Sequence, residues 1–267
     1  MPPHSNIDSA ANHIRIVLVG TQHPGNIGSA ARALKTMGLS RLVLVAPERY
    51  PDIEAHALAA GADDVLAAAP VLATLAEAVA DCRLVLGCTA RSRRVALEEH
   101  LPRAAASLVT AQAGGGAEVA LVFGRERTGL TNDELQLCHA AVHIPANPEY
   151  SSLNLAAAVQ VLAYEIRMAL LQSGGPEAST AATPTEDEPA SHAQLEGFFA
   201  QLADTLDAID FHKGRAPESA MRKLRRLFLR SALDVREVRL LRGILADAQR
   251  MARLADGKTP SGTPPLS

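Results

Sequence analysis

Short apolar runs recur along the first half of the chain and alternate with segments of helical periodicity. The runs are nearly continuous in Val, Leu and Ile, which is typical of parallel strands that are covered on both faces. We predict strands at residues 14–19, 41–46, 83–87, 118–124 and 141–145. We predict helices at about residues 27–37, 54–60, 70–81, 131–138 and 153–171. The pattern indicates an α/β fold built on a parallel sheet.

The pattern changes after this α/β domain, which we assign to residues 14–172. Residues 173–190 are rich in Gly, Pro, Ser, Thr and acids and predict a flexible linker. Residues 191–255 return to helical periodicity and predict a small domain of two or three helices. Residues 1–13 and 256–267 are interpreted as disordered tails, and the first of them has neither the basic flank nor the apolar stretch of a signal peptide.

Composition places the protein among soluble globular proteins. Of 267 residues, 48% are hydrophobic and 21% charged, and no apolar run approaches the roughly 18 residues of a membrane span. We therefore expect a cytoplasmic protein without a membrane partner. The three cysteines, Cys82, Cys88 and Cys138, fit no metal-ligand spacing and leave one over in any disulfide pairing. We expect reduced thiols and no metal site.

Charge is unevenly distributed along the chain. The net charge is -3, yet residues 211–253 hold 12 Lys or Arg against 4 Asp or Glu. In AMRKLRRLFLRSAL, Arg222, Arg226 and Arg230 recur at helical spacing and so share one face, while Met221, Leu224 and Leu227 share another. Nearby Lys213, Arg215, Lys223 and Arg225 add charge without matching acids. The pattern predicts contacts with a polyanion, and the alternatives are a solvated face or packing against acids of the α/β domain.

The loop after the first predicted strand, GTQHPGNIGSAAR at residues 20–32, leads from strand to glycines to helix. This order is shared with dinucleotide-binding proteins, but the glycines do not form G-x-G-x-x-G and the GK[ST] of a P-loop is missing. A nicotinamide-dependent oxidoreductase is therefore a weak alternative. Asn26 and Arg32 are the notable side chains of this loop, although a helix cap and a solvated arginine would also explain them.

Three further loops follow later strands, at residues 87–93, 123–130 and 144–156. Ligands of open α/β sheets bind outside the carboxyl ends of the strands, so we expect these loops to share one crevice. In FGRERTGL, Arg125 and Arg127 either pair with acids, meet phosphate or flank a solvated turn. Farther on, Ser151 or Ser152 could cap a helix, whereas Asn154 in its first turn would be a buried amide that needs partners.

Three of these segments carry a resemblance. NIGSAAR (26–32), FGRERTGL (123–130) and SSLNL (151–155) resemble, in order and spacing, the three motifs of the SpoU-type ribose methyltransferases in the SPOUT superfamily. TARSR, NPEYSSLNLAAAVQVLAYEIRMA and MRKLRRLF are also similar to the bacterial TrmJ group, which methylates the ribose 2'-hydroxyl at nucleotide 32 of the tRNA anticodon loop. The resemblance covers residues 14–172 closely and residues 195–250 in part.

The resemblance implies a parallel sheet with a deep C-terminal trefoil knot, a homodimer, S-adenosylmethionine as cofactor and tRNA as substrate. It assigns catalytic roles to Arg32, Glu126, Ser152 and Asn154. It assigns contacts with the cofactor to Cys88, Thr89, Ala90, Gly124, Ile144, Ser151, Ser152 and Leu153. To these we add RNA contacts by Asn26, Arg91, Arg93, Arg222, Arg226 and Arg230. Gly124 would let the main chain approach the cofactor closely.

The family commonly uses its first-motif arginine, here Arg32, as a base. Arginine stays protonated in proteins, so we interpret Arg32 as a group that orients RNA and stabilises charge, with phosphate or water as open choices for the proton acceptor. Ribosomal RNA is the alternative substrate. A non-catalytic RNA-binding protein is the alternative class, although it would leave the four catalytic residues unexplained.

Overall fold

The computed structural model describes residues 9–90, 97–150, 152–173, 188–214 and 216–256. The chain divides into two compact units, Met1–Thr183 and Pro184–Ser267, which we describe separately as the α/β unit and the helical unit. The division falls within the segment 173–190 that the sequence assigns to a linker.

The α/β unit contains a seven-stranded sheet in which every strand pair is parallel. The strands are β1 (Ile14–Val19), β2 (Arg41–Val45), β3 (Val71–Leu72), β4 (Leu84–Cys88), β5 (Glu99–His100), β6 (Val119–Phe123) and β7 (Ala140–Val142). Their order across the sheet is β3-β2-β1-β6-β4-β7-β5. The predicted α/β class with a parallel sheet is confirmed.

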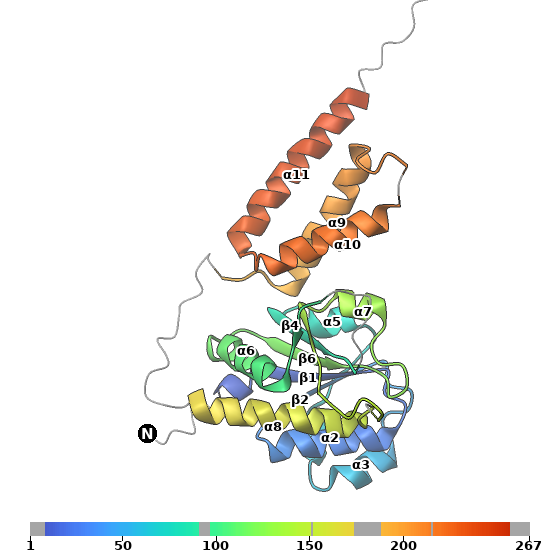
Figure 1. The fold of residues 1–267 in the computed structure, drawn as a ribbon, viewed down its shortest axis with the longest axis vertical. Coiled ribbons are helices and arrows are strands. Elements are labelled where there is room, and N and C mark those ends of the chain that lie inside the picture. Colours follow the sequence, from blue (N-terminus) through green and yellow to red (C-terminus); the bar gives the residue numbers. More distant parts are fainter. Residues whose placement is uncertain (1–8, 91–96, 151, 174–187, 215, 257–267) are drawn as a thin grey trace, which may run out of the picture. The chain divides into compact units, whose positions relative to one another are not determined.

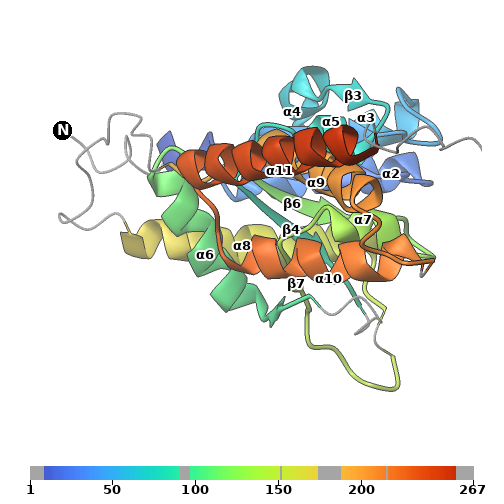
Figure 2. The ribbon, with the colours of Figure 1, turned by 90° about the horizontal axis from the view of Figure 1, so that it is seen from above.

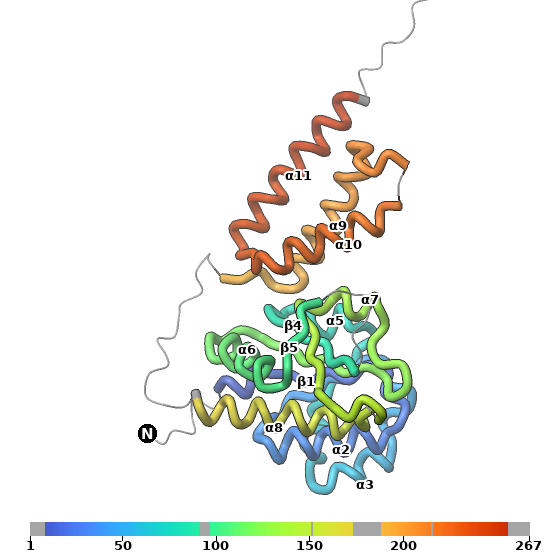
Figure 3. Tube along the Cα trace, viewed as in Figure 1, coloured from blue at the N-terminus to red at the C-terminus, as the bar shows by residue number. Residues whose placement is uncertain are grey.

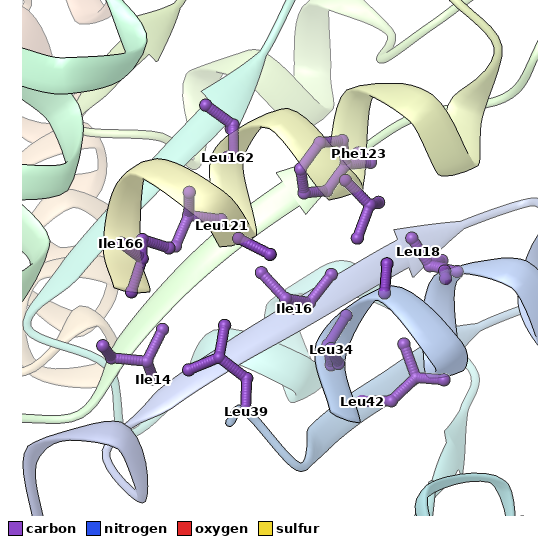
Figure 4. Close-up of a cluster of buried hydrophobic side chains, with 14 of the residues drawn as sticks. Ile14, Ile16, Leu18, Leu34, Leu39, Leu42, Leu121, Phe123, Leu162 and Ile166 are labelled. Atoms are coloured by element: carbon purple, nitrogen blue, oxygen red, sulfur yellow. The ribbon is translucent and has the colours of Figure 1, made fainter. Parts of the chain in front are cut away.

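Helices cover both faces of this sheet (Figure 1). They are α2 (Pro24–Thr36), α3 (Ile53–Ala59), α4 (Asp63–Ala68), α5 (Leu75–Val79), α6 (Pro102–Gly114), α7 (Asn132–Gln136) and α8 (Leu155–Ser173). On one face, Ile14, Ile16 and Leu18 of β1 pack with Leu34 of α2 and Ile166 of α8 (Figure 4). On the other face, Val17 and Val19 pack with Leu75 and Val79 of α5. Alternate residues of one apolar strand thus enter two cores, because successive side chains point to opposite faces.

By length and composition alone, α8 could cross a membrane, since Leu155–Gln172 has a mean hydropathy of 1.3. Its Val159, Leu162, Ala163 and Ile166 are buried in the core that α2 and the sheet share. The apolar face of α8 is therefore accounted for by packing within the α/β unit.

Several predicted boundaries differ from the structure. Residues 9–11, assigned to a tail, form a helical turn in which Ala10 and Ala11 are buried in the core. Residues 70–81, predicted as one helix, contain β3 and then α5, which begins after the capping box of Thr74 and Glu77. The sequence analysis missed α4, α6 and β5. By contrast, the capping box predicted at Thr131 and Glu134 is confirmed at the start of α7.

The helical unit contains three helices, α9 (His192–Ala208), α10 (Pro217–Arg230) and α11 (Val235–Asp256). Phe198 and Phe199 of α9 lie in its core, against Met221, Leu224 and Phe228 of α10. The predicted packing face of α10 is therefore wrong in one position. Phe228 packs inward, because the larger ring fills the space beside Phe198, whereas Leu227 is 47% exposed.

Candidate active site

The site lies at the carboxyl ends of β1 and β6, which are neighbours in the sheet. Leu18 of β1 pairs with Phe123 of β6, so the loop that follows β1 and the loop that follows β6 leave the sheet side by side. This register brings Glu126 to the amino-terminal end of α2.

Glu126 is held by three neutral groups. Its carboxylate accepts hydrogen bonds from the backbone N–H of Gln22 at 3.0 Å, the backbone N–H of His23 at 3.1 Å and Nδ2 of Asn26 at 2.9 Å. Burial raises the pKa of Glu126, but these hydrogen bonds outweigh it and hold the pKa below its ordinary value. The carboxylate also lies where the positive end of the α2 dipole favours negative charge. Glu126 is thus an ionised anchor with its oxygens engaged, which suits orientation rather than proton transfer.

Asn26 links Glu126 to the start of α8. While its Nδ2 binds Glu126, its Oδ1 accepts a hydrogen bond from Nδ2 of Asn154 at 3.0 Å. Oδ1 of Asn154 in turn accepts from the backbone N–H of Ala156 at 2.9 Å and so caps α8. We had expected Asn154 to be buried inside the first helical turn. It is instead exposed and precedes the helix, because its side chain satisfies a free amide of that first turn.

Arg125 fixes the loop that carries Glu126. Its Nη1 donates to both carboxylate oxygens of Glu134 at 3.0 Å, which settles one of the alternatives left by the sequence. A Cβ on Gly20, which has φ of +59°, would lie 2.7 Å from Nε of Arg125. Arg125 therefore presses against the same loop whose amides bind Glu126.

Gly124 has a different neighbour from the one the sequence suggested. A Cβ built there would lie 2.2 Å from the backbone of Gly129 and Leu130, and Arg125 and Gly129 form an antiparallel bridge. The glycine is required because the FGRERTGL loop folds back on itself at this point. Any approach to a cofactor is additional to that requirement.

A cavity of about 430 Å³ opens beside these loops. Seven of the eight residues expected to contact a cofactor line it, namely Cys88, Thr89, Ala90, Gly124, Ile144, Ser152 and Leu153. Ser151, the eighth, lies outside the described residues. Burial raises the pKa of the Cys88 thiol to about 12, so the thiol stays protonated and inert. The cavity thus gathers three loops that are far apart in sequence, and the assignment of its residues to a cofactor stays a prediction.

Not every predicted residue joins this site. Arg32 is exposed on α2, and its guanidinium has no hydrogen bond or ion pair with any residue that the structure describes. By contrast, Ser152 does line the cavity, and it is exposed there. Arg91 and Arg93 lie outside the described residues.

Two groups that bind Glu126 and one cavity residue are not evident from the sequence motifs. The backbone amides of Gln22 and His23, which hold Glu126, carry no signal in side-chain motifs. Arg127 lines the cavity, is exposed and has no partner within the described part of the chain. The sequence does not distinguish Arg127 from Arg125, whereas in the structure only Arg125 pairs with Glu134.

A second candidate surface lies on α10. Arg222, Arg226 and Arg230 are exposed, and none of them pairs with a carboxylate of the described helical unit. Arg225, counted among the unmatched charges, is mostly buried. It pairs with Glu196, lies 4.5 Å above the ring of Phe199, and burial lowers its pKa to about 10. The basic face therefore excludes Arg225, because that residue turns inward.

Comparisons with known proteins agree with this division into two units. Residues 13–164 match the family described as "SpoU rRNA Methylase family", and residues 193–257 match "tRNA methyltransferase TrmJ, C-terminal domain". The chain is 50% identical over 246 residues to the tRNA (cytidine/uridine/adenosine-2'-O-)-methyltransferase TrmJ of Pseudomonas aeruginosa, covering 91% of this chain and 96% of the relative. It is 52% identical over 239 residues to the tRNA (cytidine/uridine-2'-O-)-methyltransferase TrmJ of Klebsiella pneumoniae, covering 89% and 97%.

A solved structure is also similar. The crystal structure of TrmJ from Z. mobilis superposes with a TM-score of 0.74 at 37% identity and covers 87% of this chain and 97% of that one. With a family match over more than half of the chain and relatives at half identity over most of it, this chain belongs to the SpoU methylase family, in the group that carries the TrmJ C-terminal domain.

Proposed function

We propose that this protein is a tRNA 2'-O-methyltransferase that methylates the ribose of cytidine or uridine at nucleotide 32 of the anticodon loop. The relatives from P. aeruginosa and K. pneumoniae carry the names of tRNA 2'-O-methyltransferases at about half identity. The observation that carries the proposal is the hydrogen-bonded chain Glu126–Asn26–Asn154, which joins the three segments that resemble the family motifs. The choice of nucleotide 32 rests on the resemblance to the TrmJ group.

The cavity fits S-adenosylmethionine as the methyl donor. Its volume of about 430 Å³ lies within the roughly 300 to 1,000 Å³ of small-molecule sites. Its wall contains small side chains such as Cys88, Thr89 and Ala90 together with apolar Ile144 and Leu153, which suit a nucleoside without phosphate. When bound, this cofactor would supply an electrophilic methyl group, whose bond to sulfur breaks as a bond to the ribose 2'-oxygen forms.

The protein's own residues would align the acceptor and stabilise charge. Glu126, kept ionised by its hydrogen bonds, orients Asn26, and Asn26 orients Asn154 at the start of α8. Ser152 on the cavity wall would hold the ribose. Arg32, which stays protonated, would bind the neighbouring phosphate, while the 2'-hydroxyl proton leaves to a phosphate oxygen or water.

Arg32 would act on the site of a second copy, which makes the functional unit a homodimer. Within one chain it lies exposed on α2, contacts none of Glu126, Asn26 and Asn154, and does not line the cavity. A residue required by the family chemistry but absent from its own cavity is explained if two copies complete each other's sites. Light scattering should accordingly give a dimer.

We also propose the deep trefoil knot that the resemblance implies. β7 pairs with β4 on one side and β5 on the other, so residues 89–98 connect two strands that lie on opposite sides of β7. Figure 3 labels β4 and β5 on the Cα trace of this unit. A segment after β7 that passes through that connection would make a knot, a rare exception among folds. This strand order supports the proposal.

The helical unit would hold the tRNA body through its basic face, and the whole enzyme would work in the cytoplasm. Arg222, Arg226 and Arg230 are spaced to meet successive phosphates, which position RNA without reading its sequence. Ribosomal RNA is the second candidate substrate, favoured by the family name over residues 13–164. The match of residues 193–257 to a tRNA methyltransferase domain favours tRNA.

The test is transfer of a labelled methyl group from S-adenosylmethionine to unmodified transcripts of tRNA and of ribosomal RNA domains. Sites of 2'-O-methylation are then mapped by their resistance to alkaline cleavage. The proposal predicts label in tRNA at nucleotide 32. Label confined to ribosomal RNA would replace the substrate, and label in neither would overturn the function.

A further inference from the structure

The loop between β7 and α8 carries the most exposed aromatic ring in the described part of the α/β unit. Tyr150 is 83% exposed, and the next aromatic residue, Tyr164 of α8, is 49% exposed. Figure 2 shows this loop extending away from the end of β7. A single exposed aromatic ring is ordinary on a protein surface, but the position of this ring suggests a function.

The loop leaves the cavity wall and returns to it. Ile144 before the loop and Ser152 after it both line the cavity. Two residues after Ser152, Asn154 joins the hydrogen-bonded chain that ends at Glu126. Along the chain, Tyr150 therefore lies two residues from the cavity wall and four from the site network.

The turn that presents the ring is well held. Oδ1 of Asn147 accepts from the backbone N–H of Glu149 at 3.1 Å, and its carbonyl oxygen accepts from the backbone N–H of Tyr150 at 2.9 Å. Pro148 fixes a further backbone angle. A ring on a turn that is already ordered loses little conformational freedom when it binds a ligand, so its contact adds to affinity.

An exposed ring on a loop beside the proposed RNA site matches the way proteins bind loop nucleotides. Bases in single-stranded loops can be turned out and stacked on aromatic side chains. Stacking tolerates any base, because every base has a π-face. The relatives' names span cytidine and uridine, and in one case adenosine, so this group uses contacts that do not discriminate between base edges.

We propose that Tyr150 stacks on the nucleobase of the target nucleotide and holds its ribose at the cavity while leaving base identity unread. This inference rests on the proposed function, since it names how the acceptor of that reaction is held. In this proposal the aromatic ring of Tyr150 makes the contact, and its phenolic hydroxyl is not required.

The first test uses Tyr150→Trp, because the chain has no tryptophan of its own. The introduced indole is then the single reporter and can be excited where RNA absorbs little. Titration with an anticodon stem-loop in the presence of S-adenosylhomocysteine should quench its fluorescence as the base stacks. A stem-loop that lacks the target base but keeps its ribose should bind without that quenching. Equal quenching by both RNAs, or none by either, would overturn the proposal.

The second test is kinetic. Tyr150→Leu should raise the KM for tRNA about ten-fold, the low end of what a lost base stack costs, with kcat within about two-fold by the same account. Tyr150→Phe should retain the wild-type KM. The rise should be equal for transcripts with cytidine and with uridine at the target. The matched control is Tyr164→Leu, which removes an exposed tyrosine from the middle of α8 and should leave the KM unchanged.

Three results would contradict the inference: an unchanged KM in Tyr150→Leu, an equal loss in Tyr150→Phe, or an effect that depends on the target base. Affinity for S-adenosylhomocysteine and thermal unfolding, measured on each variant, exclude damage to the cavity or fold. If the wild-type protein methylates no tRNA, the proposed function fails, whereas the fluorescence titration still reports whether the ring stacks.

Discussion

The two ends of the sheet in the α/β unit differ in how their central carboxylate is held. At the amino ends of β1 and β2, buried Arg15 donates to Asp81 at 2.6 Å and to Glu118 at 2.5 Å, and Arg41 also pairs with Glu118. Burial raises the pKa of Glu118, but the bonds from Arg15, His13 and Arg41 hold it below its ordinary value. Each carboxylate there binds a guanidinium, so the charges neutralise one another.

At the carboxyl ends, the carboxylate of Glu126 binds only neutral donors among the described residues. Arg127 on the cavity wall is exposed without a carboxylate partner in the described chain, and so is Arg32, which lies farther along α2. An arginine that is paired with a carboxylate has to give up that ion pair to bind a phosphate, whereas an unpaired arginine does not. The comparison therefore distinguishes a structural end from an end that we propose to be functional, and the following changes should break or sharpen this distinction.

The largest effect should come from Arg32, the unpaired arginine of α2. Arg32→Ala should lower kcat by about 100- to 1,000-fold, the usual cost of removing one group that stabilises developing charge. Affinity for S-adenosylhomocysteine in a calorimetric titration should stay the same. Arg32→Lys should rescue poorly, because an ammonium lacks the planar fork that fixes a phosphate. Near-normal turnover of the alanine variant would remove Arg32 from the mechanism.

The next effect concerns the anchor of that end. Glu126→Ala leaves the amides of Gln22 and His23 and the side chain of Asn26 without an acceptor. These donors are partly exposed, so water replaces part of the lost bonding, and methyl transfer should fall about ten-fold, toward the low end of the roughly 1 to 3 kcal/mol for an unsatisfied buried group. Glu126→Gln, which keeps one carbonyl acceptor, should fall between it and the wild type. Equal activity of all three would show that the network is dispensable.

The same residue gives a pH prediction. Because the folded-state pKa of Glu126 lies below its ordinary 4.5, its stabilising contribution is complete above about pH 4.5 and is lost as the pH falls through the folded-state value. A plot of rate against pH between about pH 5 and 8 should therefore have the same inflections for the wild type and for Glu126→Gln. An inflection that is present in the wild type and absent from Glu126→Gln would make Glu126 a proton-transfer group.

A smaller and different effect is expected at the structural end. Glu118→Gln leaves buried Arg15 with one carboxylate instead of two. The free energy of unfolding should fall by about 2 kcal/mol, below the usual cost of breaking a buried pair because Glu118 keeps partial contact with water. Denaturant unfolding measures the loss. The folded fraction of Glu118→Gln should keep the wild-type kcat. If its kcat fell as much as that of Glu126→Ala, the two ends of the sheet would not differ in function.

The smallest effect should arise in the helical unit, whose basic face resembles the functional end in having unpaired cations. Arg222, Arg226 and Arg230 changed together to Gln should raise the KM for tRNA a few-fold. The salt dependence of binding should flatten by about one counterion per lost phosphate contact. Cofactor affinity should not change. A loss of thermal stability with an unchanged salt slope would instead mean that this face packs against acids.

The sequence predicted the strands and the site motifs better than the contacts between them. Continuous apolar runs predicted β1 and β6, because a strand that is buried on both faces has no polar residues to interrupt the run. The helix α6 was missed because its alanines, serine and threonine give little contrast between faces, although Pro102 at its start was a usable signal. β3 was hidden inside a predicted helix, although the capping box at Thr74 marked where the helix begins.

Contacts of the site depend on register, which a single sequence does not specify. Arg125 and Arg127 read alike as charges that flank a glycine loop, yet one binds Glu134 and the other binds no residue of the described chain. In the same way, Arg225 and Arg226 are adjacent arginines of one helix, but only Arg225 turns onto Phe199. The sequence identified the charged residues of the candidate site. Strand order and helix phase determine which of these arginines pair with a carboxylate among the described residues.

The account's central claim is that unpaired Arg32 serves the functional end of a second copy. The direct test is to co-express Arg32→Ala and Glu126→Ala copies with different affinity tags and to purify the mixed dimer through both tags. One of its two sites would combine Arg32 of one copy with Glu126 of the other, so methyl transfer should return to about half of the wild-type rate. A mixed dimer no more active than the two variants alone would contradict the claim, because it would place Arg32 and Glu126 in the same copy's site.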